Sequence, residues 1–140
     1  MSALNKFSPS TSLTIDGKKI SKEDPTYFIA DIAANHDGDI DRVKKLIHLA
    51  AESGADAAKF QHFKAKTIVS DYGFKNLGLQ KSHQSSWKKS VFEVYNDASL
   101  NLDWTERILQ FCKEVGITFI TTPYSLEVVN FMDKYIPAYK

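Results

Sequence analysis

The sequence has little of what would mark a secreted, membrane or nucleic-acid-binding protein. Its single cysteine, Cys112, cannot form a disulfide within the chain, which is typical of proteins from a reducing cytosol. No apolar run approaches the ~18 residues of a membrane-spanning helix, and residues 1–10 lack the apolar core of a secretory signal. Eighteen basic residues nearly balance 17 acidic ones, so the net charge of +1 gives no reason to expect nucleic acid or a membrane as partner.

The sequence also lacks the spacing patterns of several well-defined sites. No histidines and cysteines are spaced as in a zinc site, and neither a P-loop nor a G-x-G-x-x-G fingerprint is present. No serine or cysteine has the sequence context of a nucleophile elbow. Since 43% of the residues are hydrophobic and 25% are charged, the composition is that of an ordinary folded domain.

Apolar strands alternate with amphipathic helices along the chain. A hairpin is expected first, with Asp16-Gly17 as a type I′ turn between residues 13–15 and 18–20. Strands are expected at 27–30, 57–60 and 117–122, and the beginning of a fourth at 138–140. Three amphipathic helices are expected: one between Asp39 or Asp41 and Gly54, one between an Asp103/Glu106 capping box and Gly116, and one after Ser125. This alternation predicts an α/β fold with parallel strands.

The chain divides into two regions. Residues 1–26 are expected to form the hairpin and a linker, and residues 27–140 the α/β region. Residues 64–100 are too many for a simple connection, so they are interpreted as an insertion, with a short helix or apolar patch near Val91–Tyr95.

Each complete strand ends in polar side chains, where functional residues of parallel sheets gather. The first strand leads into Asp31, Asn35 and His36, and the second into Lys59, Gln61 and His62. The third leads into Thr122 and Tyr124, although Thr-Thr-Pro by itself also suits an ordinary strand end. Alternation along the strands places Asp31, Lys59, Gln61, Thr122 and Tyr124 in one interior, and leaves the direction of His62 open.

Lys59 is the most informative of these residues, because an unpaired buried ammonium is unfavourable. Two interpretations of Lys59 are open: an ion pair with Asp31 that has only a structural role, or an anion site for phosphate or carboxylate. We favour the anion site. Schiff-base chemistry requires a neutral amine, which the sequence does not show. Asn35 and His36 precede a helix N-terminus in the first strand-to-helix loop, so we expect them to line the pocket.

Three blocks of the sequence, residues 28–39, 54–61 and 117–124, resemble the N-acetylneuraminate (sialic acid) synthase family. The hairpin and Tyr139-Lys140 also match, so the resemblance covers nearly the whole chain except the insertion. It implies a (β/α)8 TIM barrel of which the first half, about four strands, is present here. Two positions depart from the family pattern, which usually has Glu where this chain has Asp31 and Asn where it has Asp37.

The resemblance implies condensation of phosphoenolpyruvate with an N-acetylated amino sugar, N-acetylmannosamine or a relative, to form a nonulosonic acid and phosphate. It gives Asp31 and Lys59 catalytic roles, with Lys59, Thr122 and Lys140 holding phosphoenolpyruvate. Gln61 and Tyr124 would line the sugar side, and Asn35 and His36 the pocket mouth.

The resemblance also implies a divalent metal, Mn²⁺, and a cytoplasmic homodimer. The metal ligands are expected in the C-terminal half of the barrel, so no metal ligand is assigned in this chain. A barrel of this type needs about 250 residues, so we expect a fragment that is inactive alone. Two alternatives stay open: another phosphate-handling TIM-barrel lyase or aldolase, with Lys59 or Lys140 as nucleophile, and a non-catalytic half-barrel binding module.

Overall fold

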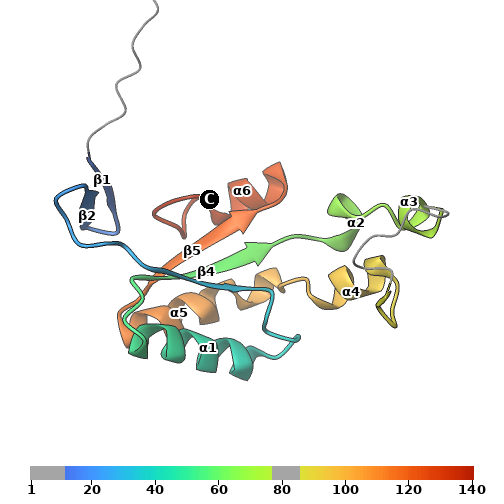
Figure 1. Ribbon diagram of the computed structural model, residues 1–140, viewed down its shortest axis with the longest axis horizontal. Helices are drawn as coiled ribbons and strands as arrows, with labels where there is room; N and C mark the ends of the chain where they lie inside the picture. Colours follow the sequence, from blue (N-terminus) through green and yellow to red (C-terminus); the bar gives the residue numbers. More distant parts are fainter. Residues whose placement is uncertain (1–11, 77–85) are drawn as a thin grey trace, which may run out of the picture.

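A computed structural model describes residues 12–76 and 86–140, and Figure 1 shows how its elements are arranged. The part of the expected insertion at 77–85 and the part of the expected N-terminal region at 1–11 lie outside the described residues. The described elements are β1 Ser12–Ile15, β2 Lys18–Ser21, β3 Ile29–Ala33, α1 Ile40–Glu52, β4 Ala57–His62, α2 Ala65–Ile68, α3 Asp71–Lys75, α4 Val91–Asp97, the 3-10 turn η2 Leu102–Trp104, α5 Thr105–Val115, β5 Thr118–Pro123 and α6 Leu126–Met132.

Strands β1 and β2 form the antiparallel hairpin that the sequence predicts. Asp16 and Gly17 have φ angles of 49° and 79°, and positive values at both positions are what a type I′ turn requires. Lys18 pairs with Asp56, whose other carboxylate oxygen accepts from the Phe28 backbone nitrogen at 2.6 Å. These contacts hold the hairpin at the end of the sheet where β4 begins (Figure 1).

The central sheet is parallel and has the strand order β3-β4-β5, which confirms the predicted α/β arrangement. Strand β4 lies in the middle, pairing Asp31 of β3 with Lys59, and Gln61 with Thr122 of β5. The expected fourth strand is reduced to one bridge between Thr121 and Tyr139. Among the described residues, β3 is therefore an edge strand with β4 as its only neighbour.

The ends of the two long helices show which capping predictions hold. Asp39 caps α1 by accepting from the backbone nitrogens of two following residues, and Gly54 follows the helix with a φ of 82°. Gly116 ends α5 with a φ of 71°, as predicted. The predicted capping box at Asp103 is wrong, because Asp103 lies in the 3-10 turn η2, which Asn101 caps by accepting from the Asp103 nitrogen. Helix α5 follows η2 and begins after Trp104, whose side chain makes no capping hydrogen bond.

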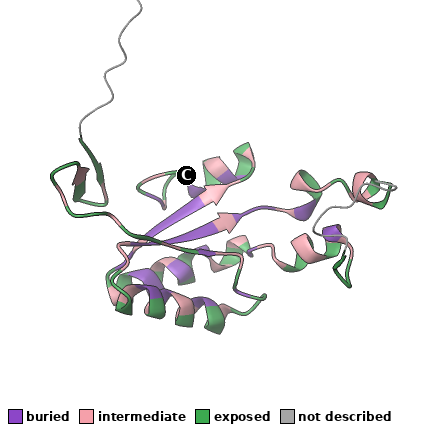
Figure 2. Ribbon diagram, in the orientation of Figure 1, coloured by how far each residue is buried: buried purple, intermediate pink, exposed green. Residues whose placement is uncertain are grey.

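The hydrophobic core lies between one face of the sheet and helices α1 and α5, which run beside each other below the strands in Figure 1. We call this face, with Ala58, Phe60 and Phe119, the helix face. Figure 2 shows the buried residues on the strands and on the sides of the two helices that meet there. Phe60 is fully buried, with its ring centroid 5.7 Å from that of Phe119.

Helices α2, α3 and α4 lie beyond the carboxyl ends of β4 and β5 (Figure 1). The helix expected near Val91–Tyr95 is confirmed as α4. A capping box begins it, in which Ser90 and Glu93 satisfy each other's backbone nitrogens. None of the helices in the described part of the chain is long and apolar enough to cross a membrane.

Candidate functional site

The register of the sheet brings four of the predicted residues onto one face. Lys59 and Gln61 of β4 stand beside their register partners Asp31 and Thr122, on the face opposite Phe60. We call this the lysine face. The sequence prediction of one shared interior therefore holds for the positions of these four side chains, whereas their functional roles stay predictions.

Lys59 is the buried charge of this face. Its side chain is 6% exposed, and its Nζ lies 2.7 Å from Oδ1 of Asp31, whose side chain is 58% exposed. The two groups form an ion pair by distance, but the angles do not satisfy a hydrogen bond, and Nζ has no hydrogen-bond acceptor among the described residues. An ammonium group can donate three hydrogen bonds, so Lys59 retains donors for a further anionic group.

Gln61, Tyr124 and Thr122 extend the lysine face beyond the ends of β4 and β5. Nε2 of Gln61 donates to the hydroxyl of Tyr124 at 3.1 Å. The hydroxyl of Thr122 is buried and has no partner within the described parts of the chain. Lys140 is exposed, and its backbone nitrogen donates to the Thr121 carbonyl at 3.5 Å, which holds it beside β5. Gln61, Thr122 and Tyr124 therefore supply amide and hydroxyl groups on the same face as Lys59.

His36 is not brought to the lysine face. It is fully buried, its Nδ1 accepts from the Gly38 nitrogen at 3.1 Å, and its ring meets Trp104 edge-on at 6.3 Å. Burial lowers the pKa of His36 below its usual value, against opposing effects of the Ala98 carbonyl and the Asp37 carboxylate. Asn35 is exposed, and its side chain donates to the Ile32 carbonyl at 2.9 Å. The imidazole predicted at the pocket mouth therefore lies inside the fold.

His62, whose direction the sequence left open, points into the helix face. It is 1% exposed, and its Nδ1 lies 2.8 Å from the hydroxyl of Thr121. Burial, together with repulsion from His36, lowers the pKa of His62 from 6.5 to about 4, so the ring is neutral at pH 7. The even spacing from Phe60 is the sequence signal for this direction, because alternate strand residues share a face.

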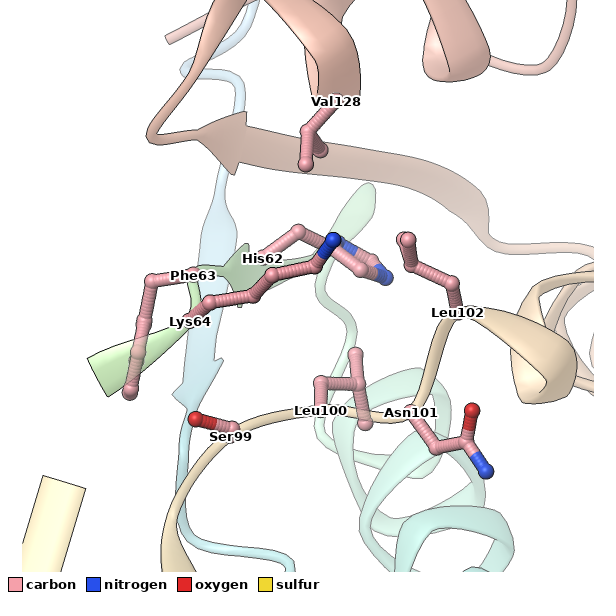
Figure 3. A pocket seen from close by; sticks show the side chains of 8 residues that line it. All are labelled: His62, Phe63, Lys64, Ser99, Leu100, Asn101, Leu102 and Val128. Atoms are coloured by element: carbon pink, nitrogen blue, oxygen red, sulfur yellow. The ribbon is translucent and has the colours of Figure 1, made fainter. Parts of the chain in front are cut away.

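A cavity of about 230 Å³ lies beside His62, between the ends of β4 and β5 and the segment before α5. Figure 3 shows its lining, with Val128 above His62 and Leu100 below it. The Nε2 atom of His62 has no hydrogen-bond partner among the described residues. This cavity is lined mostly by carbon and belongs to the opposite side of the sheet from Lys59.

The residues present do not form a metal centre. Within residues 12–76 and 86–140, no three His, Cys, Asp or Glu side chains come together as a ligand set. Cys112 is a buried free thiol whose pKa is raised by burial to about 12, which is the behaviour of a core residue.

A parallel sheet with a buried lysine in its central strand defines an α/β protein with a candidate anion site. A model of the NeuB family matches residues 46–140. The chain belongs to the NeuB family, which confirms the resemblance to sialic acid synthases.

The chain is similar to several synthases over about a third of their length. It is 35% identical to N,N'-diacetyllegionaminic acid synthase from Campylobacter jejuni, covering 78% of this chain and 32% of the relative. It is 30% identical to human N-acetylneuraminate-9-phosphate synthase, covering 89% of this chain and 34% of that one. The crystal structure of SpsE from Bacillus subtilis, a spore coat polysaccharide biosynthesis protein, aligns with a TM-score of 0.66 at 27% identity. The alignment covers 91% of this chain and 32% of SpsE.

Proposed function

We propose that these residues form the first part of a (β/α)8 barrel that condenses phosphoenolpyruvate with an N-acetylated amino sugar, N-acetylmannosamine or a relative. The product would be a nonulosonic acid, with phosphate released. The buried ammonium of Lys59 carries this proposal, since it lies on the lysine face with donors that Asp31 does not satisfy. A substrate with a phosphate and a carboxylate supplies the acceptors that it lacks.

In this proposal the lysine face holds phosphoenolpyruvate. Lys59 and Lys140 bind its anionic groups, and the hydroxyl of Thr122, which has no partner among the described residues, donates to one of them. Asp31 keeps the Lys59 ammonium in place from the exposed side. Carbon C3 of phosphoenolpyruvate then attacks the aldehyde carbon of the sugar, water adds at C2, and the C2–O bond breaks as phosphate leaves. Gln61 and Tyr124 contact the sugar.

The remaining partners belong to the proposal as well. A divalent metal such as Mn²⁺ would polarise the aldehyde, on ligands outside the residues described. The full protein would act as a homodimer in the cytoplasm, for which the buried free thiol of Cys112 is suitable. Asn35, exposed before the amino end of α1, stays a proposed pocket residue, and the proposed role of His36 becomes one of shaping the loop from inside.

An aldolase with a Schiff-base lysine is less well supported. A Schiff base forms from an amine that is free to attack a carbonyl group, whereas Nζ of Lys59 is engaged in an ion pair with Asp31 at 2.7 Å. Treatment with borohydride in the presence of a carbonyl substrate distinguishes the two reactions. The condensation forms no imine, so we expect no covalent adduct on Lys59 or Lys140.

The test is phosphate release by the complete gene product from phosphoenolpyruvate and N-acetylmannosamine. We expect Lys59→Ala to lower kcat/KM about a hundredfold or more, because losing a charged hydrogen-bond partner costs ~3 kcal/mol. Lys45→Ala, which removes an exposed lysine of α1, is the matched control and should keep normal turnover. Near-normal turnover of Lys59→Ala would refute the role of Lys59.

A further inference from the structure

The cavity beside His62 lies on the helix face of the sheet, and the proposed reaction does not use it. Its volume is about 230 Å³, whereas a cavity of about 150 Å³ already holds a benzene ring. Most of its wall is carbon, to which Leu100, Leu102 and Val128 contribute. Figure 3 shows the side chains of His62 and Lys64 extending between Leu100 and Val128. The cavity therefore combines an apolar wall with two nitrogen-bearing side chains.

The imidazole of His62 leaves a hydrogen-bond donor in this cavity. His62 is 1% exposed, and its Nδ1 lies 2.8 Å from the hydroxyl of Thr121. That hydroxyl has no other partner within the described parts of the chain, so we assign its hydrogen to Nδ1. A neutral imidazole then carries its own proton on the other nitrogen, and Nε2 of His62 has no partner among the described residues. A buried donor without an acceptor is unfavourable, so the site favours a ligand that accepts a hydrogen bond.

Lys64 brings a positive charge to the same cavity, whose lining it joins. Its Nζ donates to Glu127 at 3.3 Å, and the two side chains are 42% and 74% exposed. An ion pair this exposed is weak, so the ammonium group is available to an anionic group in the cavity. Two other polar side chains of the lining are already engaged, since Ser99 donates to a backbone carbonyl and Asn101 caps η2.

These groups define the chemistry of a fitting ligand. A carboxylate has two oxygens that accept hydrogen bonds, one for Nε2 of His62 and one for the Lys64 ammonium, and the bonds it forms are strengthened by its charge. An apolar body behind the carboxylate would be stabilised by burial against the carbon wall. A single water molecule fits less well, because a buried water needs two to four polar partners.

We propose that this cavity binds a small monocarboxylate whose apolar body is about the size of a benzene ring. Nε2 of His62 and Nζ of Lys64 hold the carboxylate, and Leu100, Leu102 and Val128 enclose the apolar body. Because the sheet separates this cavity from the lysine face, the ligand is distinct from the substrates of the proposed reaction.

The probe is para-fluorobenzoate, titrated into the complete gene product and followed by fluorine NMR. We expect a Kd of about 1 mM or tighter, in line with the binding free energy per atom of small ligands. The matched ligand is para-fluorobenzyl alcohol, which has the same ring without the charge and should bind at least about tenfold more weakly. Saturating phosphoenolpyruvate should leave the Kd for para-fluorobenzoate unchanged, because the two ligands occupy opposite sides of the sheet.

Two variants test the residues of the site. Lys64→Met removes the charge from a partly exposed position and should weaken binding of para-fluorobenzoate about tenfold without affecting the fold. Lys66→Met, at an exposed lysine of α2 outside the lining, is the matched control and should leave the Kd unchanged. Val128→Phe fills the cavity and should abolish binding of both probes. Lys59→Ala, on the lysine face, should bind para-fluorobenzoate as the unmodified protein does.

The outcomes decide for or against the site. Tighter binding of the carboxylate than of the alcohol, lost in Val128→Phe and weakened in Lys64→Met, upholds the proposal. Equal affinity for the two probes overturns the carboxylate assignment. Displacement by phosphoenolpyruvate, or loss of binding in Lys59→Ala, means that the probe binds on the lysine face and overturns the proposal. Absence of binding at millimolar probe overturns it as well. All these readouts are independent of turnover, so a failure of the condensation reaction is detected separately.

Discussion

The two faces of β4 each bury a polar side chain, and they do so in different ways. On the lysine face, Lys59 keeps a carboxylate at 2.7 Å and unsatisfied donors. On the helix face, His62 is held as a neutral ring against the Thr121 hydroxyl, with a pKa lowered to about 4. A charged group is tolerated in a buried position where a counter-ion is within reach, whereas a group packed among core residues gives up its charge.

The largest effect on stability should come from the helix face. Phe60→Ala removes a fully buried ring from the centre of the core, so we expect a loss of about 4 kcal/mol in the free energy of unfolding. Urea denaturation of the purified protein measures it. Phe28→Ala, at a position 61% exposed, is the control and should cost less than about 1 kcal/mol. Equal losses in the two variants would mean that the core is not where the structure places it.

The second largest effect is the pH dependence that His62 gives to the free energy of unfolding. Its pKa is about 4 in the folded protein and 6.5 in the reference state, so the unfolded chain binds more protons between these values. Stability is therefore complete above pH 6.5 and is lost as the pH falls towards 4, by up to about 3 kcal/mol. Urea titrations at several pH values give the free energy of unfolding as a function of pH. Between pH 4 and 6.5, this free energy should rise less steeply with pH for His62→Gln than for the unmodified protein. Parallel slopes would contradict a buried neutral His62.

A smaller loss of stability is expected on the lysine face when only the carboxylate is removed. Asp31→Asn leaves the buried Lys59 ammonium without its counter-ion, which is unfavourable. Because the Asp31 side chain is 58% exposed, solvent screens the pair, and we expect a loss of about 1–2 kcal/mol. Asp37→Asn, a more exposed carboxylate in the following loop, is the matched control and should change stability by less than about 0.5 kcal/mol.

The smallest change in stability should follow removal of the buried charge itself. Lys59→Met keeps most of the side-chain volume and leaves Asp31 exposed to water, so the free energy of unfolding should change by no more than about 1 kcal/mol. In the complete gene product, the same substitution should abolish phosphoenolpyruvate-dependent turnover. A stable and inactive Lys59→Met protein would separate the ligand role of the lysine face from the packing role of the helix face. A loss above about 2 kcal/mol would make Lys59 a structural residue.

Local sequence patterns predicted most of the elements, because turns and caps depend on neighbouring residues. Asp16-Gly17 predicted the hairpin, and Asp39, Gly54 and Gly116 predicted helix ends that the structure confirms. The Asp103 cap failed because Asp103 lies inside the 3-10 turn η2, which Asn101 caps, and α5 begins only after Trp104. Helix caps are correctly predicted where the helix begins directly after the capping residue, as α1 does after Asp39.

The candidate site was predicted on β4 and incompletely on β3. Alternation is regular along β4, so Lys59 and Gln61 share a face as expected. Strand β3 contains an irregularity between Asp31 and Ala33, where Ala33 has a φ of 52°. Such a bulge changes which face the following residues reach, and the sequence has no glycine there to signal it. The burial of His36 follows this break, so its direction could not be predicted from alternation.

The edge-on contact between His36 and Trp104 gives the chain an optical reporter of its own interior. The sequence has two tryptophans, and Trp87 lies in the insertion, far along the chain from this contact. With Trp87 replaced by phenylalanine, all indole fluorescence comes from a ring whose neighbour is a buried imidazole at 6.3 Å. A protonated imidazole quenches indole emission more strongly than a neutral one, so the light emitted by Trp104 reports the charge of His36 without any label.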